Sequence, residues 1–290
     1  MATLRDIRQK IAAVKKTQQI TKAMNMVSAA KLRGAQTRME QFRPYAAAFR
    51  QMLASIASRV EPEAHPFFQQ AEKVERIELV LMTADRGLCG SFNMNLINTA
   101  ERFIRQKQAE GIEVVLTTVG RKGRDYFRRR KYTIGQHYVD VWNKFDFSNA
   151  QAVGRDAVTP YNKQEVQEVY LIYANFINMV VQRPTLVQLL PIVPEAAGEA
   201  GGPTQEYLTE PAADEFLGYL LPRYINVSVY QGFLENSTSE HAARMTAMDN
   251  ASSNCKEMIT SLTLVMNKAR QAAITKELMD IIGGAEALKG

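Results

Sequence analysis

A chain of 290 residues with 46% hydrophobic and 23% charged residues has an ordinary soluble composition, and it is long enough to bury one large core or two modest ones. Its longest apolar runs fall short of the roughly 18 residues that a membrane span needs, and the N-terminus lacks the apolar core of a signal peptide. We therefore expect it to stay inside the cell or organelle. Cys89 and Cys255 are too few for a disulfide framework, which favours a reducing compartment.

The net charge of +6 is unevenly spread along the chain. Residues 1–59 hold twelve Lys or Arg against Asp6 and Glu40, so this segment carries +10 and the remainder carries −4. A strongly basic segment implies an acidic partner, which is nucleic acid, anionic lipid or an acidic protein surface. Charge alone does not choose among the three.

Residues 4–60 repeat a heptad pattern that predicts one long helix with a narrow inward seam. The register is apolar at both ends but polar over residues 18–28, where the apolar side chains lie off the register. We expect the inward face to change phase there and to take in Ile20, Ala23, Met24 and Val27. The inward positions of the unshifted register are Leu4, Ile7, Ile11, Val14, Gln18, Thr21, Asn25, Ser28, Leu32, Ala35, Met39, Phe42, Ala46, Phe49, Leu53, Ile56 and Val60.

Pro44 lies inside this helical pattern and predicts a kink, because a mid-helix proline removes one backbone hydrogen bond. The alternative is a helical hairpin that ends at Pro44. The apolar register continues through Phe49 and Ile56, which favours the continuous helix.

After residue 66 the pattern changes to short apolar strands that alternate with helices. This order predicts a small α/β domain with a largely parallel sheet. Residues 194–211 are rich in Gly, Pro and acidic residues and predict a loop. The predicted strands are residues 76–83, 112–119, 169–176 and 185–190, and the predicted helices are residues 94–108, 122–129 and 149–162.

Residues 239–287 predict a second long helix with a three-four seam, which we expect to end at Gly283 and Gly284 in a left-handed terminus. Two such seams of matching length favour an antiparallel pair. The predicted fold is thus a long antiparallel coiled coil of the N- and C-terminal helices with an inserted Rossmann-like α/β domain. The seam positions are Met245, Met248, Ser252, Cys255, Ile259, Leu262, Met266, Ala269 and Ala273. The expected divisions are 1–62 (N-terminal coiled-coil helix), 70–195 (inserted α/β domain), 196–222 (loop and short helix) and 223–290 (C-terminal coiled-coil helix).

No sequence motif predicts catalysis, a metal or a cofactor. The glycine loop at residues 85–91 fits neither dinucleotide-binding nor P-loop spacing, so a nucleotide-dependent enzyme is the weaker hypothesis. Asp85 and Arg86 more often brace such a loop through hydrogen bonds and a surface ion pair. The histidines are scattered without metal-ligand spacing, and neither cysteine has a recognisable catalytic partner. The histidines are His65, His137 and His241.

Residues 121–131, RKGRDYFRRRK, interleave seven basic residues with two aromatic ones. Such a run is used by some nucleic-acid-binding proteins, but it is more often the solvated face of a helix. A basic coiled-coil nucleic-acid-binding protein is therefore the alternative to the function inferred next.

Three separate segments resemble the γ subunits of F-type ATP synthases. They are ITKAMNMV at residues 20–27, DRGLCG at residues 85–90 and AAITKELMDIIGGA at residues 272–285, and the likeness includes EHAARM at residues 240–245. The resemblance covers the chain end to end. It implies a non-catalytic rotor shaft inside a ring of three α and three β subunits, one copy per complex, with ε and the membrane-embedded c-ring as further partners. It also implies a peripheral location at the cytoplasmic face of the bacterial plasma membrane.

The family pattern assigns two sets of contacts. Thr209 departs from that pattern, because an aromatic residue is common there, and this weakens its c-ring contact. The contacts with the α/β ring would be Lys22, Met24, Arg244, Arg270, Gln271, Thr275 and Glu277, and those on the c-ring and ε side Tyr207, Thr209 and Glu210.

Overall fold

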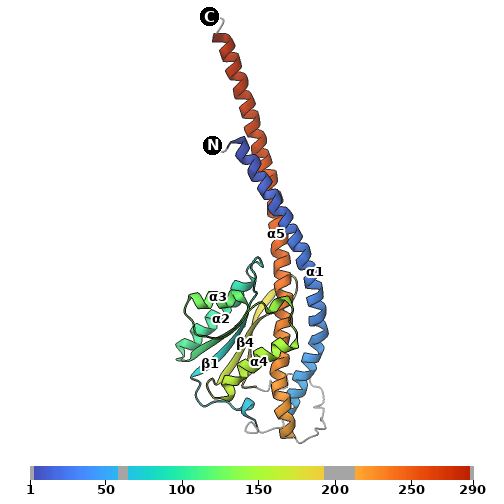
Figure 1. Ribbon diagram of the computed structural model, residues 1–290, viewed down its shortest axis with the longest axis vertical. Coiled ribbons are helices and arrows are strands. Elements are labelled where there is room, and N and C mark those ends of the chain that lie inside the picture. The colour runs from blue at the N-terminus through green and yellow to red at the C-terminus, as the bar shows by residue number, and fades with distance from the viewer. Residues whose placement is uncertain (1–2, 58–64, 193–212, 288–290) are drawn as a thin grey trace. The chain divides into compact units, whose positions relative to one another are not determined.

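The computed structural model describes residues 3–57, 65–192 and 213–287, and the chain forms two compact units. Unit 1 comprises residues 1–28 and 245–290, and unit 2 comprises residues 29–244. Two long helices, α1 (Leu4–Ala57) and α5 (Ala213–Ala287), each contribute residues to both units (Figure 1).

In unit 1, α1 and α5 run antiparallel (Figure 1). The burial of the side chains confirms the predicted seam of α5. Met248 is buried, and the other eight seam positions from Met245 to Ala273 are half-buried. On α1, Ile7 and Ile11 are buried as expected. A seam this narrow is typical of a two-helix coiled coil.

The expected change of phase in α1 is wrong. Ile20, Met26 and Val27 are 60%, 60% and 57% exposed, and Ala23 is also exposed, whereas the unshifted register stays inward. Short hydrogen bonds explain how polar residues occupy this seam, because a buried polar group is tolerated when it has a partner. The bonds run from Thr21 Oγ1 to Gln18 O (3.0 Å), from Ser28 Oγ to Met24 O (2.8 Å) and from Asn25 Nδ2 to Met245 O (2.9 Å).

Asn25 is a seam residue of α1 whose side chain donates a hydrogen bond to the other helix. Replacing Asn25 with Leu should stabilise unit 1 by about 1 kcal/mol and weaken the specification of its helix register, because a polar seam residue fixes register at a cost in stability. Hydrogen exchange of α1 amides before residue 28 measures the first effect, and a disulfide engineered across the native register measures the second. Slower exchange in Asn25→Ala than in Asn25→Leu would contradict this role.

α1 is one continuous helix, as predicted, whereas α5 extends further than the sequence indicated. α1 continues through Pro44 to Ala57, so the hairpin alternative is wrong, while the kink at Pro44 stays a prediction. α5 begins at Ala213 and includes Pro222, so residues 213–222 of the expected loop and short helix belong to α5. α5 also continues through Gly283 and Gly284 to Ala287, and the expected left-handed terminus is wrong.

Unit 2 contains a five-stranded sheet of order β3-β2-β1-β4-β5. The first four strands are parallel and β5 pairs antiparallel with β4, which confirms the largely parallel sheet. The described strand β3 was not predicted, because IGQHY is polar and contains a glycine. The strands are β1 (Arg76–Met82), β2 (Glu113–Val119), β3 (Ile134–Tyr138), β4 (Glu168–Phe176) and β5 (Gln182–Leu190).

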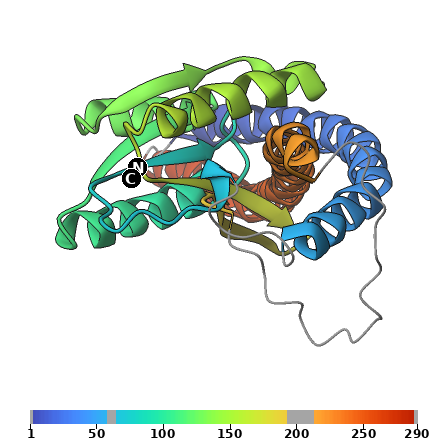
Figure 2. The ribbon, with the colours of Figure 1, turned by 90° about the horizontal axis from the view of Figure 1, so that it is seen from below.

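Helices cover both faces of the sheet (Figure 2). Ile77, Leu79 and Leu81 of β1 pack on the side of α2 and α3, where they form the main apolar core. Alternate residues of a strand point to opposite faces, so Glu78 and Val80 point to the side of α4. The helices are α2 (Phe92–Ala109), α3 (Arg121–Arg129) and α4 (Phe147–Asn162), with short 3-10 turns η2 (Pro66–Phe68) and η3 (Val141–Asn143).

Candidate partner-contact surfaces

The final turns of α5 expose apolar side chains that unit 1 does not cover. Every described side chain from residue 274 to residue 285 is exposed, including Ile281 at 69% and Met279 at 64%. A single helix gains most of its stability from tertiary packing, and a large exposed apolar surface marks an interaction site. This end of α5 is therefore a candidate partner surface, and the exposed Ile20, Met26 and Val27 form a second one on α1.

Most of the residues assigned to the α/β ring lie on the surface of unit 1. Lys22 is exposed and Met24 is half-buried on α1. The α5 residues of this set that lie in unit 1 are all exposed: Arg270, Gln271, Thr275 and Glu277. The residues assigned to the c-ring and ε side are Tyr207, Thr209 and Glu210, and they lie outside the described residues. The predicted loop at 194–211 also lies outside them.

Arg244 belongs to unit 2, where it joins α5 to the glycine loop. Its Nη1 lies 2.7 Å from Oε1 of Glu240, and its Nη2 donates to Gly87 O at 3.2 Å. The two charged side chains are only 11% and 7% exposed. Burial raises the pKa of Glu240, and the charge of Arg244 opposes that rise. The pair thus holds the loop against the helix from inside the unit.

The glycine loop at residues 85–91 is braced by hydrogen bonds to α2 and to the first residue of α3. Asn93 Oδ1 accepts from Ala84 N at 2.8 Å, and Asp85 Oδ1 accepts from Arg121 N at 2.8 Å, which confirms the bracing role predicted for Asp85. Leu88 and Gly90 adopt positive φ. Cys89 is buried, and this burial raises the pKa of its thiol. Such a thiol is a weak nucleophile.

A run of polar side chains on α5 bonds to β4 where β4 extends past β1. The β1–β4 pairing ends at Leu81 and Ile172. Beyond it, Asn236 Oδ1 accepts from Ala174 N at 3.1 Å, and Glu235 Oε2 accepts from Phe176 N at 3.0 Å. α5 therefore supplies hydrogen bonds that a neighbouring strand would otherwise supply.

The same carboxylate of Glu235 ties α1 to α5 in unit 2. Arg43 Nε and Nη2 donate to its two oxygens at 2.7 and 2.9 Å, and Nη2 also donates to Phe176 O at 2.9 Å. Glu235 is 1% exposed and Arg43 is 41% exposed. The sequence analysis predicted neither the Arg43–Glu235 pair nor the Arg244–Glu240 pair. The first joins residues that are distant in the sequence, and the second joins neighbouring turns of one helix, where a charged pair is usually exposed.

Three of the seven basic residues at positions 121–131 make ionic or aromatic contacts within unit 2. Arg121 pairs with Asp140 at 2.7 Å, Arg124 pairs with Asp125 at 2.8 Å, and the guanidinium of Arg130 lies 3.7 Å from the centre of the Tyr126 ring. These contacts fit the solvated helix face better than a nucleic-acid groove.

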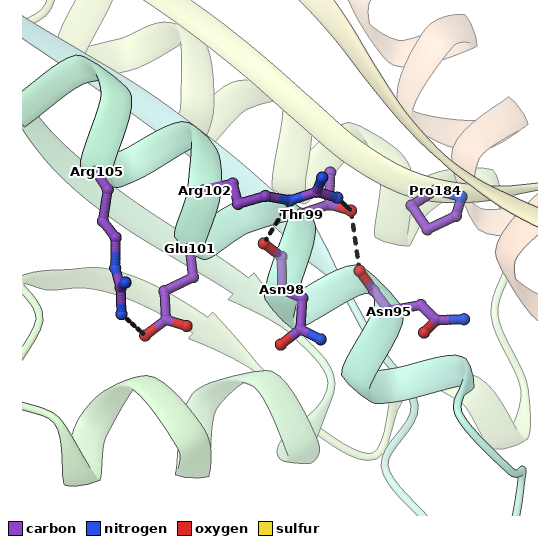
Figure 3. A pocket seen from close by; sticks show the side chains of 7 residues that line it. All are labelled: Asn95, Asn98, Thr99, Glu101, Arg102, Arg105 and Pro184. Carbon is purple, nitrogen blue, oxygen red and sulfur yellow. Dashed lines mark hydrogen bonds and ion pairs between the residues drawn. The ribbon is translucent and has the colours of Figure 1, made fainter.

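A polar hollow of about 650 Å³ lies along α2 beside Pro184 of β5 (Figure 3). Arg102 donates to Thr99 Oγ1 at 3.4 Å, and Arg105 pairs with Glu101 at 3.3 Å, so both guanidinium groups contact their own helix. The hollow is open and has no buried charged group among its described lining residues. Its polar lining is open to solvent and does not enclose a ligand site.

The histidines occupy unrelated places. His65 caps η2 by accepting from Phe67 N at 3.1 Å, and His137 is exposed on β3. His241 is half-buried, and burial lowers its pKa to about 4. Within the three described ranges, no three His, Cys, Asp or Glu side chains group so that they could hold a metal ion. The described helices also include none that is long and apolar enough to cross a membrane.

Known proteins resemble this chain along its whole length. A family model described as ATP synthase matches residues 3–288. The chain is 54% identical over 291 residues to an ATP synthase gamma chain of Syntrophobacter fumaroxidans, with 100% of both chains covered. It is 52% identical over 291 residues to an ATP synthase gamma chain of Syntrophus aciditrophicus, with 99% of both chains covered.

Solved structures share the fold. One is a chain of the central stalk and c-ring structure of the Tetrahymena thermophila mitochondrial ATP synthase, with a TM-score of 0.62 and 25% identity over 80% of this chain and 99% of that one. Another belongs to the rotor of the Euglena gracilis mitochondrial ATP synthase, with a TM-score of 0.68 and 21% identity over 93% and 98%. The second likeness concerns fold alone. None of these findings supports the nucleic-acid-binding alternative.

Proposed function

The chain belongs to the γ chain family of ATP synthases, and from this premise we propose that it is the central rotor shaft of a rotary ATP synthase. It would couple ion flow through a membrane c-ring to ATP synthesis or hydrolysis on α and β subunits. One copy would stand inside three α and three β subunits. The observation that carries this proposal is the exposed apolar end of α5, which unit 1 leaves uncovered.

The shaft would act through unequal contacts. A helix pair presents a different side chain to each surrounding subunit, and a ligand or partner shifts an equilibrium only through its differential interaction with the states. The exposed Arg270, Gln271, Thr275 and Glu277 would contact the α/β ring from α5, and Lys22 and Met24 would do so from α1. Complementary charge would steer the basic α1 toward acidic surfaces of the ring without locking it.

Arg244 would contribute less directly than the exposed residues. Its guanidinium already bonds Glu240 and Gly87 O. We infer that it sets the position of the glycine loop, and that its contact with the ring is made by the small exposed part of its side chain.

The remaining assignments follow the family. The proposed subunit has no catalytic site of its own and needs no cofactor, and it would lie peripherally at the cytoplasmic face of a bacterial plasma membrane. We propose that residues 1–62 and 223–290 form the shaft and that residues 70–195 form the inserted domain. Tyr207, Thr209 and Glu210 would contact the c-ring and the ε subunit.

The test of the rotor function is purification from native membranes through a tag on this chain, followed by subunit stoichiometry and an ATPase assay. One tagged chain per three α and three β subunits, with ATPase activity in the complex and none in the chain alone, is the expected result. Recovery of the chain alone or with nucleic acid would overturn the proposal.

A charge reversal tests the assigned contact at Lys22. Lys22→Glu should lower ATP synthesis by the assembled complex roughly two- to tenfold, because one steering charge on an interface contributes a modest energy. Lys16→Glu is the matched control, since Lys16 is an exposed lysine of the same helix that the assignment omits. Both variants should keep the helix content of the parent chain by circular dichroism. Equal activities of the two variants would remove Lys22 from the contact set.

A further inference from the structure

Three elements of unit 2 meet at the carboxylate of Glu235, which lies on α5 and is 1% exposed. One of its oxygens accepts from Nε of Arg43 on α1 at 2.7 Å, and the other accepts from Phe176 N of β4 at 3.0 Å. Arg43 Nη2 donates to that second oxygen and to Phe176 O, at 2.9 Å in both bonds. The pair Arg43–Glu235 therefore binds both backbone groups of Phe176, the last residue of β4.

α5 makes further hydrogen bonds to β4 that do not involve Arg43. Asn236 Oδ1 accepts from Ala174 N at 3.1 Å, and Ser239 Oγ donates to Ala174 O at 3.0 Å. Both of these α5 residues are fully buried. A variant that weakens the bonds of Arg43 should therefore leave α5 attached to the sheet, because two more bonds to β4 remain.

Side chains near Arg43 attach α1 to α5. The ring of Phe42 packs edge-on against the ring of Tyr230 of α5, with 4.9 Å between the ring centres. Arg50 Nη1 donates to Gln231 Oε1 of α5 at 2.6 Å. Arg43 instead reaches the backbone of β4 as well as α5. Arg43 thus links α1 directly to the sheet, whereas Phe42 and Arg50 link it to α5.

Arg43 also lies beside a weakened turn of α1. Pro44 follows it inside the helix and has no backbone N–H, so the carbonyl of residue 40 cannot accept the usual helical bond from it. α1 nevertheless continues from Leu4 to Ala57. A helix that lacks one such bond bends more easily at that turn, so an attachment beside Pro44 has a large effect on the direction of α1.

From these contacts we propose that Arg43 is a positioning residue, which fixes the direction of α1 on the sheet at the turn that Pro44 weakens. On the proposed rotor function, which this inference takes as its premise, a turning force on the sheet would reach α1 through Arg43 as well as through α5. Arginine suits this role because its planar guanidinium presents its N–H donors in a fixed fork. A lysine has a single nitrogen and cannot hold both oxygens of Glu235 and the carbonyl of Phe176 in one plane.

Hydrogen exchange in the full chain tests the attachment itself. Arg43→Lys keeps the positive charge but loses the fork, so exchange of the Phe176 amide should become about tenfold faster. The Ala174 amide, which a different side chain of α5 binds, should exchange as in the parent chain. Arg50→Lys is the matched control, because it changes an exposed arginine of the same helix that bonds α5, and it should leave both amides unchanged.

Ion pumping per ATP hydrolysed by the assembled complex tests the role in the rotor. In membrane vesicles, the Arg43→Lys complex should hydrolyse ATP at about the parent rate and pump about twofold fewer ions per ATP, because an α1 that yields at Pro44 transmits only part of the turning force. A purely structural loss would instead lower the yield of complex, and hydrolysis and pumping would then fall in the same proportion.

A second substitution separates positioning from stability. Pro44→Ala restores the missing N–H and stiffens α1, so in the Arg43→Lys background it should return pumping per ATP to the parent value. It should not slow exchange of the Phe176 amide, because the guanidinium of Arg43 is still absent. A double variant that recovers both properties, or neither of them, would overturn the proposal.

Two further outcomes concern the single variants. Equal exchange of the Phe176 amide in Arg43→Lys and Arg50→Lys, or parental pumping per ATP in the Arg43→Lys complex, would each overturn the proposal and leave the rotor function standing. A parent chain recovered without α and β subunits would overturn the rotor function and this role with it, whereas the exchange rates would be unaffected.

Discussion

Replacing Glu240 with Ala should lower the free energy of unfolding of unit 2 by about 3–5 kcal/mol, because the change leaves a buried guanidinium without its carboxylate. Arg244 is 11% exposed, and its remaining bond is the one to Gly87 O at 3.2 Å. A single carbonyl does not compensate a desolvated positive charge. The glycine loop should therefore loosen together with this part of α5.

Urea unfolding followed by the fluorescence of Trp142 measures this loss, because Trp142 is the single tryptophan and packs 5.2 Å from the ring of Phe233 in α5. Hydrogen exchange at residues 86–90 should rise in the same variant. The control is the double variant Glu240→Ala with Arg244→Met, which removes both charges and should recover most of the loss. A double variant less stable than the single one would show that the loop, and not the unpaired charge, dominates the effect.

The seams of both long helices could be predicted because the spacing of apolar residues carries the helical period. The polar middle of α1 could not, since the sequence does not show that Thr21 and Ser28 satisfy their hydroxyls on their own helix. The predicted change of phase rests on the rule that apolar side chains of a helix point inward. Ile20 and Val27 instead point outward, where they are available to a partner.

The polar residues 235–240 of α5, in unit 2, show again that the sequence does not reveal which polar side chains are buried. Glu235, Asn236 and Glu240 are polar residues of kinds that are mostly exposed, yet all three are buried. Their partners are backbone groups of β4, Arg43 on α1 and Arg244 one turn further along α5. Burial of a polar residue depends on partners brought in by the tertiary fold, and local periodicity does not contain that information.

Only part of the candidate contact surface could be predicted from the sequence. The family resemblance assigned Thr275 and Glu277, and the structure shows that these positions are exposed, whereas their contacts stay a prediction. The burial of Glu78 could not have been predicted from RIELVLMT, because a glutamate is almost never fully buried unless it is paired. Its burial depends on the tertiary fold, which places it beside Thr117 of β2 and near the charge of Asp156 on α4.

Replacing Glu78 with Gln should stabilise unit 2 by about 3 kcal/mol at pH 8 and leave its stability nearly unchanged at pH 4. Burial is the main cause that raises the pKa of Glu78 to about 7, with the charge of Asp156 acting in the same direction and the hydrogen bond from Thr117 opposing it.

The sign follows from proton binding. The folded chain holds this proton up to pH 7 while the unfolded chain releases it near pH 4.5, so the contribution of Glu78 to stability is full below pH 4.5 and is lost as the pH rises through 7. His241, whose pKa burial lowers to about 4, acts oppositely and destabilises the fold as the pH falls from about 6.5. Urea titrations of the parent chain and of Glu78→Gln are read by Trp142 fluorescence at a series of pH values. They isolate the Glu78 contribution because His241 is common to both chains. A difference between the two chains that stays constant from pH 4 to pH 8 would contradict the assigned titration.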